Sequence, residues 1–179
     1  SESRAYFNAI DYMIEEEKMA VIIQEVIGNE HNGRYYPEIS GVAQSYNFYP
    51  FSYIQPEDGF AVTAIGLGAY VVGGEKTHRF SPAYPKLQLA STQDKIKASQ
   101  RYFYGVNMLA QDYDLYRDGE NAAIKAYDIS EAERDGTLEY TASVYDFMND
   151  QITYDFSVKG PRIVDFSKIL QYDYFPLAP

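Results

Sequence analysis

Residues 18–80 constrain the fold of this chain more than any other stretch. Three apolar runs occur in it, at residues 19–27, 41–46 and 60–65. Turn-rich segments containing Asn-Gly, Pro and Asp-Gly separate the runs, and a glycine-rich turn follows the third. The first run is nearly all apolar and rich in β-branched residues, which favours a strand covered on both faces. The pattern therefore predicts three strands joined by loops.

Composition limits the classes of protein to which the chain can belong. Its 179 residues favour one domain, and a hydrophobic fraction of 46% is enough for a sizeable core. A formal net charge of −11 opposes binding to phosphate backbones and anionic lipid, so neither nucleic acid nor a membrane is an expected partner. The chain has no cysteine, which excludes disulfides and thiolate chemistry and is compatible with the cytosol.

The pattern predicts an α+β fold with a mostly antiparallel sheet and flanking helices. The sheet combines the three runs, and a helix at residues 3–17 packs on one face. We expect a first subdomain at residues 1–85 and a strand-rich extension at residues 86–179 packed on it. Within the extension, residues 138–147 and 152–158 alternate as two antiparallel strands do. The predicted core includes Ile10, Val21, Ile23, Val42, Val62, Ala64, Val144 and Ile163.

A glycine-rich turn, Gly66-Leu67-Gly68, ends the third run. Glycine permits a tight turn and the close approach of a ligand, and we expect residues 69–72 to form one helical turn. A strand, a glycine turn and a short helix can present backbone N–H groups to phosphate. The turn matches neither the dinucleotide-binding fingerprint nor a Walker loop, so alone it does not identify a nucleotide site.

Three short segments follow one another along residues 18–80. They are Met19-Ala20-Val21-Ile22-Ile23-Gln24-Glu25-Val26, Ser40-Gly41-Val42-Ala43 followed by Asn47, and Ala64-Ile65-Gly66-Leu67-Gly68 followed by Val71-Val72 and Gly74. In this order they resemble the Val-Gln-x-Met-Val, Ser-Gly-Val-Ala-Phe-Thr-Arg-Asn-Pro and Gly-Leu-Gly-Glu-x-Val-Val-x-Gly segments of the pyruvate phosphate dikinase and phosphoenolpyruvate synthase family. The likeness is to the N-terminal, ATP-grasp-like domain of that family.

The resemblance implies a fold and an activity. In the family, two α+β subdomains clamp ATP, which phosphorylates a His on a separate domain before the phosphoryl group passes to pyruvate. This implies a bacterial, cytoplasmic phosphotransferase that uses ATP and Mg²⁺. The chain would be a fragment of it, resembling the C-terminal part of an ATP-grasp domain. Gln24, Glu25 and Val26 would lie at the hinge that reads adenine and ribose. Gly66 and Gly68 would face the phosphates and Mg²⁺.

This sequence departs from the family pattern at several positions. Ala69 replaces the Glu of Gly-Leu-Gly-Glu, and Tyr46 falls on the Arg of Thr-Arg-Asn-Pro. Gly73 and Glu75 fall on the Gln and Arg often found in the family's Val-Val-Gln-Gly-Arg segment. Phosphoryl transfer relies on cations that neutralise developing charge. The departures therefore remove groups that this chemistry uses.

Neighbouring residues offer replacements for the lost groups. We expect Lys76 and Arg79 to supply positive charge in catalysis and Glu75 to hold the metal. The Gly-Gly-x-x-Ser-His segment that carries the family's phosphorylated His is absent, and neither His31 nor His78 stands in such a context. The chain alone therefore cannot run the full reaction.

Two other functions stay open at this point. A non-catalytic member of the fold, with a structural or regulatory role, would explain the lost charges. A module that binds carbohydrate or protein would explain the 19 Tyr and 10 Phe, which occur with no Trp, because tyrosine faces stack on sugars and fill half-buried strands.

Overall fold

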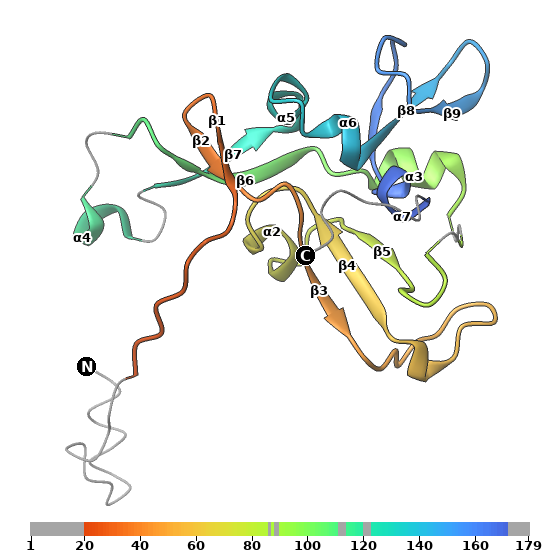
Figure 1. Ribbon diagram of the computed structural model, residues 1–179, viewed down its shortest axis with the longest axis horizontal. Coiled ribbons are helices and arrows are strands. Elements are labelled where there is room, and N and C mark those ends of the chain that lie inside the picture. The colour runs from red at the N-terminus through yellow and green to blue at the C-terminus, as the bar shows by residue number, and fades with distance from the viewer. Residues whose placement is uncertain (1–19, 86, 88–89, 111–113, 120–122, 172–179) are drawn as a thin grey trace, which may run out of the picture.

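The computed structural model describes residues 20–85, 87, 90–110, 114–119 and 123–171. It is an α+β fold with three small sheets and short helices, and every strand pairing is antiparallel (Figure 1). The predicted fold class and the antiparallel pairing are confirmed. The helix expected at residues 3–17 and the core residue Ile10 lie outside the described residues.

One sheet holds two of the three apolar runs. Its strands are β3 (Ser40–Gln44), β4 (Phe60–Ala64) and β5 (His78–Phe80), in that order across the sheet. Ser40 pairs with Ala64 and Gln44 with Phe60, so β3 and β4 form an antiparallel hairpin and are paired along their whole length. The chain leaves β4 through the glycine turn and enters α2 (Ala69–Val72), the helical turn that the sequence predicts.

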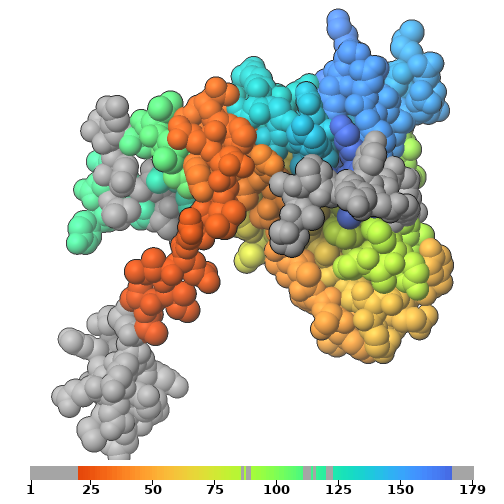
Figure 2. Space-filling model, viewed as in Figure 1, coloured from red at the N-terminus to blue at the C-terminus, as the bar shows by residue number. Residues whose placement is uncertain are grey.

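The first apolar run does not form the predicted strand. Residues 20–27 carry no strand assignment and are exposed; Val21 is 79% and Ile23 is 92% accessible. In Figures 1 and 2 this segment runs out from the body of the molecule. A strand is stabilised by a ladder partner and by cover on its faces, and no described strand pairs with residues 20–27. β5 pairs with β4 on one side of the hairpin, and no described strand pairs with the outer edge of β3.

A four-stranded sheet begins with a tight hairpin. Its strands, in spatial order, are β1 (Asn29–His31), β2 (Arg34–Tyr36), β6 (Tyr102–Asn107) and β7 (Ile124–Asp128). Asn32 and Gly33, both at positive φ, join β1 to β2. Asn-Gly is the preferred pair for this turn because both residues tolerate left-handed backbone angles.

The third sheet and most helices lie in the C-terminal half. The sheet consists of β10 (Arg162–Val164), β8 (Ala142–Asp146) and β9 (Gln151–Thr153), with β8 in the middle. The remaining helices are η2 (Pro56–Asp58, a 3-10 turn), α3 (Thr92–Ala98), α4 (Leu115–Asp118), α5 (Ile129–Arg134), α6 (Leu138–Thr141) and α7 (Ser167–Gln171). Residues 138–141, expected to open a strand, are therefore helical, and the strand expected at residues 152–158 is confined to β9.

Within the described ranges, no helix is both long and apolar enough to cross a bilayer.

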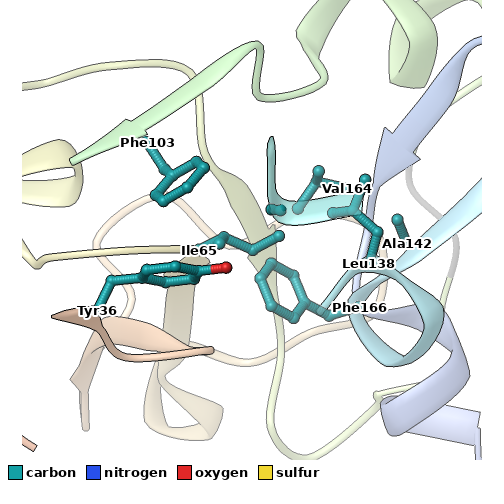
Figure 3. Close-up of a cluster of buried hydrophobic side chains, with 8 residues drawn as sticks. Tyr36, Ile65, Phe103, Leu138, Ala142, Val164 and Phe166 are labelled. Carbon is teal, nitrogen blue, oxygen red and sulfur yellow. The ribbon is translucent and has the colours of Figure 1, made fainter. Parts of the chain in front are cut away.

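A buried cluster joins elements from both halves of the chain. It contains Tyr36, Ile65, Phe103, Ala132, Leu138, Ala142, Val164 and Phe166 (Figure 3). Predicted core residues Ala64, Val144 and Ile163 are buried, as expected. Val62 is half-buried. Val42 is 40% exposed, so its prediction was wrong, as were those of Val21 and Ile23. Residues 41–44 of β3 are all exposed, so neither face of this strand is fully covered.

Candidate functional site

The first part of the glycine turn is packed against the fold. Gly66 has φ +87°, and its N–H donates to the carbonyl of Pro37 at 3.0 Å. The Leu67 N–H donates to the carbonyl of Tyr104 at 2.8 Å. A Cβ on Gly66 would lie 2.6 Å from that Tyr104 oxygen. The N–H groups of Gly66 and Leu67 are therefore already bonded within the protein, so the Gly66 N–H is not available for the phosphate contact that the resemblance implies.

The second part of the turn is open. Gly68 has ordinary helical angles, φ −56° and ψ −16°, and an added Cβ would meet no atom within 4 Å. Gly68 and Ala69 are exposed, whereas Tyr70 in the same helical turn is buried. A ligand could approach the backbone here without displacing a side chain. The accessible surface of the turn is thus Gly68 and Ala69.

The segment with Gln24, Glu25 and Val26 joins the fold beside this turn. Gly28 packs so closely on residues 36–37 that an added Cβ would lie 2.7 Å from the Tyr36 carbonyl. The Val26 carbonyl accepts a hydrogen bond from the Tyr35 hydroxyl at 2.9 Å. Beyond that point, residues 20–27 run away from the body of the molecule (Figure 1). The structure brings the base of the segment to the glycine turn, while Gln24 and Glu25 themselves are exposed.

Glu75 and Lys76 follow α2 and lie at the same end of the sheet as the glycine turn, because β5 runs antiparallel to β4. The Glu75 carboxylate accepts a hydrogen bond from Tyr102, and this bond raises the pKa of the Tyr102 hydroxyl. Tyr102 in turn contacts the ring of Tyr70, with 5.2 Å between centroids. The Lys76 ammonium is exposed and donates to the Lys97 carbonyl at 3.4 Å.

Arg79 is directed toward the other end of the sheet, away from Glu75 and Lys76. It pairs with Val62 across the sheet, and its guanidinium donates to Asn47 Oδ1 at 2.7 Å. The same guanidinium stacks 4.0 Å over the centroid of Phe60. Asn47 and Phe60 belong to the loop end of the hairpin, opposite the glycine turn. The predicted residues therefore divide between the two ends of the sheet.

Two cavities were missed by sequence reasoning. One, of about 280 Å³, lies at the loop end of the hairpin and includes Asn47, Arg79 and Ser81 in its lining. The other, of about 190 Å³, includes His78 and Asp165. Burial lowers the pKa of His78, which favours a neutral imidazole. The aromatic run at residues 46–53 was the available signal for the first cavity; nothing in the sequence signals the second, which joins distant segments.

The described ranges contain no cluster of three or more His, Asp or Glu that could hold a metal ion. An ion at Glu75 would therefore take its other ligands from a bound molecule or from water, which is common for Mg²⁺ with nucleotides.

Comparisons with protein-family models, curated proteins and solved structures gave no match to this chain.

Proposed function

We propose that the chain contributes part of the ATP-binding site of a phosphoenolpyruvate-synthase-like phosphotransferase. One observation carries the proposal: the segments that resemble the family are neighbours in space. β3 holds the Ser-Gly-Val-Ala segment and pairs along its whole length with β4, which runs into the glycine turn. The first segment enters the fold at Gly28, which packs on Tyr36 and Pro37, and the Pro37 carbonyl bonds Gly66.

In this proposal the open part of the turn receives the phosphates. Gly68 and Ala69 offer exposed backbone with room for a ligand. Lys76, which is exposed at the same end of the sheet, neutralises negative charge there. Glu75 and the phosphate oxygens together hold Mg²⁺. Gln24, Glu25 and Val26 close over the adenosine once the segment that carries them folds back. Phosphorylation of a His and then of pyruvate takes place with other domains of the intact protein.

Calorimetric titration of Mg·ATP into the intact protein tests this proposal. We expect micromolar binding, which corresponds to about −8 kcal/mol. Gly68→Asp should weaken it about tenfold or more, because the new carboxylate stands where the phosphates bind. The backbone angles of Gly68 suit Asp, and the position is open, so the variant should fold.

Gln93→Asp is the matched control, since Gln93 is exposed at the start of α3 and the substitution also adds one negative charge. Its affinity should equal that of the unsubstituted protein. Equal affinities for Gly68→Asp and Gln93→Asp would place the nucleotide elsewhere.

A non-catalytic role in a larger assembly is the second candidate. It is favoured by the engagement of Arg79 with Asn47 and Phe60, which holds that cation away from the glycine turn. Ala69 and Gly73 add no charge in its place. Absence of heat with Mg·ATP and with other nucleotides would support this role over the first.

A further inference from the structure

The cavity at the loop end of the β3–β4 hairpin has the walls of a small-molecule site. It lies beside Gly59 and Phe60, at the start of β4, whereas the glycine turn follows the end of that strand. A ligand here is therefore independent of the proposed nucleotide site. The volume, about 280 Å³, is just below the range of roughly 300–1,000 Å³ that holds drug-sized ligands. It suits a molecule of about one ring.

Hydrogen bonds within the protein hold the loop that lines the cavity. The Asn47 N–H donates to the Pro56 carbonyl at 2.7 Å, and Asn47 Oδ1 accepts from the Tyr49 N–H at 3.1 Å. Gly59, at φ +65°, lies so close to Gln44 that an added Cβ would be 2.3 Å from the Gln44 carbonyl. Such a preformed wall lowers the entropic cost of binding.

Two polar side chains that line the cavity can form more hydrogen bonds than they make with the described residues. Arg79 makes one hydrogen bond to a side chain, and no ion pair among the described residues includes it. A guanidinium has five N–H donors in a planar fork that matches a carboxylate. Ser81 is 4% exposed, yet its hydroxyl oxygen finds no partner among the described residues. Buried polar atoms in native folds are normally bonded, so this one calls for a further group.

The rim of the cavity is aromatic and exposed. Tyr49 is 84% and Phe51 is 62% accessible, and Phe60 and Phe80 also line the space. Exposed apolar patches of this kind mark binding surfaces. Aromatic rings stack with the flat faces of other rings, in offset or edge-to-face arrangements. The rim therefore selects a flat apolar body, while Arg79 selects a negative charge.

We propose that this cavity binds a small carboxylate that carries a single aromatic ring. The carboxylate pairs with the free N–H groups of Arg79, and the ring lies between the aromatic side chains of the rim. The chain has a net charge of −11. At this cavity an arginine that forms no ion pair with the described residues adjoins aromatic side chains, a combination that favours an aromatic anion.

Amide-resolved NMR titration of the full chain with benzoate tests the proposal. Benzoate should shift the Gly59 and Ser81 resonances saturably. Benzyl alcohol, which keeps the ring, and acetate, which keeps the carboxylate, should each bind about tenfold more weakly or worse. Saturable shifts confined to other regions, or equal affinities for benzoate and benzyl alcohol, would overturn it.

Substitutions separate the two halves of the site. Arg79→Gln should lower the affinity for benzoate about tenfold and leave that for benzyl alcohol unchanged. Arg117→Gln removes the same charge from an exposed side chain and should change neither. Tyr49→Ala should weaken both ligands, whereas Tyr116→Ala, at a fully exposed tyrosine, should weaken neither. Because Tyr49 is largely exposed, its variant will fold, and unaltered binding by it and by Arg79→Gln would overturn the proposal.

Discussion

Asp135 ties the first hairpin to the helices of the C-terminal half. Its side chain is fully buried and accepts hydrogen bonds from Asn32 at 2.7 Å, from Arg34 at 2.8 and 3.3 Å, and from Tyr36 at 2.9 Å. Burial alone would raise the pKa of Asp135, but the bonds from Arg34, Asn32 and Tyr36 outweigh it and lower that pKa. Because the folded pKa is below the unfolded value, near 4, this carboxylate stabilises the fold above that pH.

Asp135→Asn should lower the free energy of unfolding at pH 7 by about 3 kcal/mol, because it leaves Arg34 half-paired in a buried site. The difference between the two proteins should begin to shrink as pH falls below the unfolded pKa near 4, and it should disappear only as pH falls through the lower, folded pKa of Asp135. Urea denaturation across this pH range measures the difference. Asp118→Asn is the control: its partner Arg117 is 71% exposed, and exposed pairs contribute about 0–1 kcal/mol. A difference that stayed constant with pH would contradict the role assigned to the Asp135 charge.

At the scale of elements, the two glycines of the turn differ in how well each position tolerates a side chain. Gly66→Ala should destabilise the fold by more than about 2 kcal/mol, since it combines an unfavourable left-handed angle with a Cβ 2.6 Å from the Tyr104 carbonyl. Gly68→Ala should be neutral or stabilising by about 0.4–1 kcal/mol, because the position has helical angles and open space. Chemical denaturation of both variants is the measurement. Similar losses in the two would mean that the turn is not packed as described.

The same elements show what a sequence pattern can decide. β3, β4 and α2 were predictable because alternation, turn residues and a glycine pair act locally. Residues 20–27 have an equally strong pattern, but strand formation depends on a partner, which a pattern does not supply. Residues 138–141 alternate as a strand would, yet Leu138 and Thr141 are buried on one helical face. The Thr141 hydroxyl bonds the Thr137 carbonyl at 2.9 Å, four residues back, as in a helix.

At the scale of the whole molecule, the candidate site depends on strand order more than on sequence distance. Lys76 and Arg79 are three residues apart in the chain, yet Lys76 bonds Lys97 at one end of the sheet and Arg79 bonds Asn47 at the other. A sequence can supply the residue types of a site; which of them meet is set by register. The cavity around Arg79 was not predicted for this reason, although the sequence shows the aromatic run at residues 46–53 that contributes to its lining.

The shared core makes a prediction about how the molecule unfolds. Phe103 is fully buried, with its ring centroid 4.5 Å from that of Tyr36 and 5.7 Å from that of Tyr127. It belongs to a cluster that reaches from β2 to α6 and β10, so the parts on either side of residue 85 should unfold in one transition. Phe103→Ala should lower the free energy of unfolding by about 3–5 kcal/mol.

Thermal denaturation followed by far-ultraviolet and near-ultraviolet circular dichroism checks this prediction, because the first signal reports backbone structure and the second reports the packing of the many tyrosines. Both midpoints should coincide in the unsubstituted chain and move down together in Phe103→Ala. Phe147→Ala removes a phenylalanine that is 66% exposed and should shift the midpoints little. Two separated transitions, with only one affected by Phe103→Ala, would mean that the halves fold independently and that the cluster does not couple them.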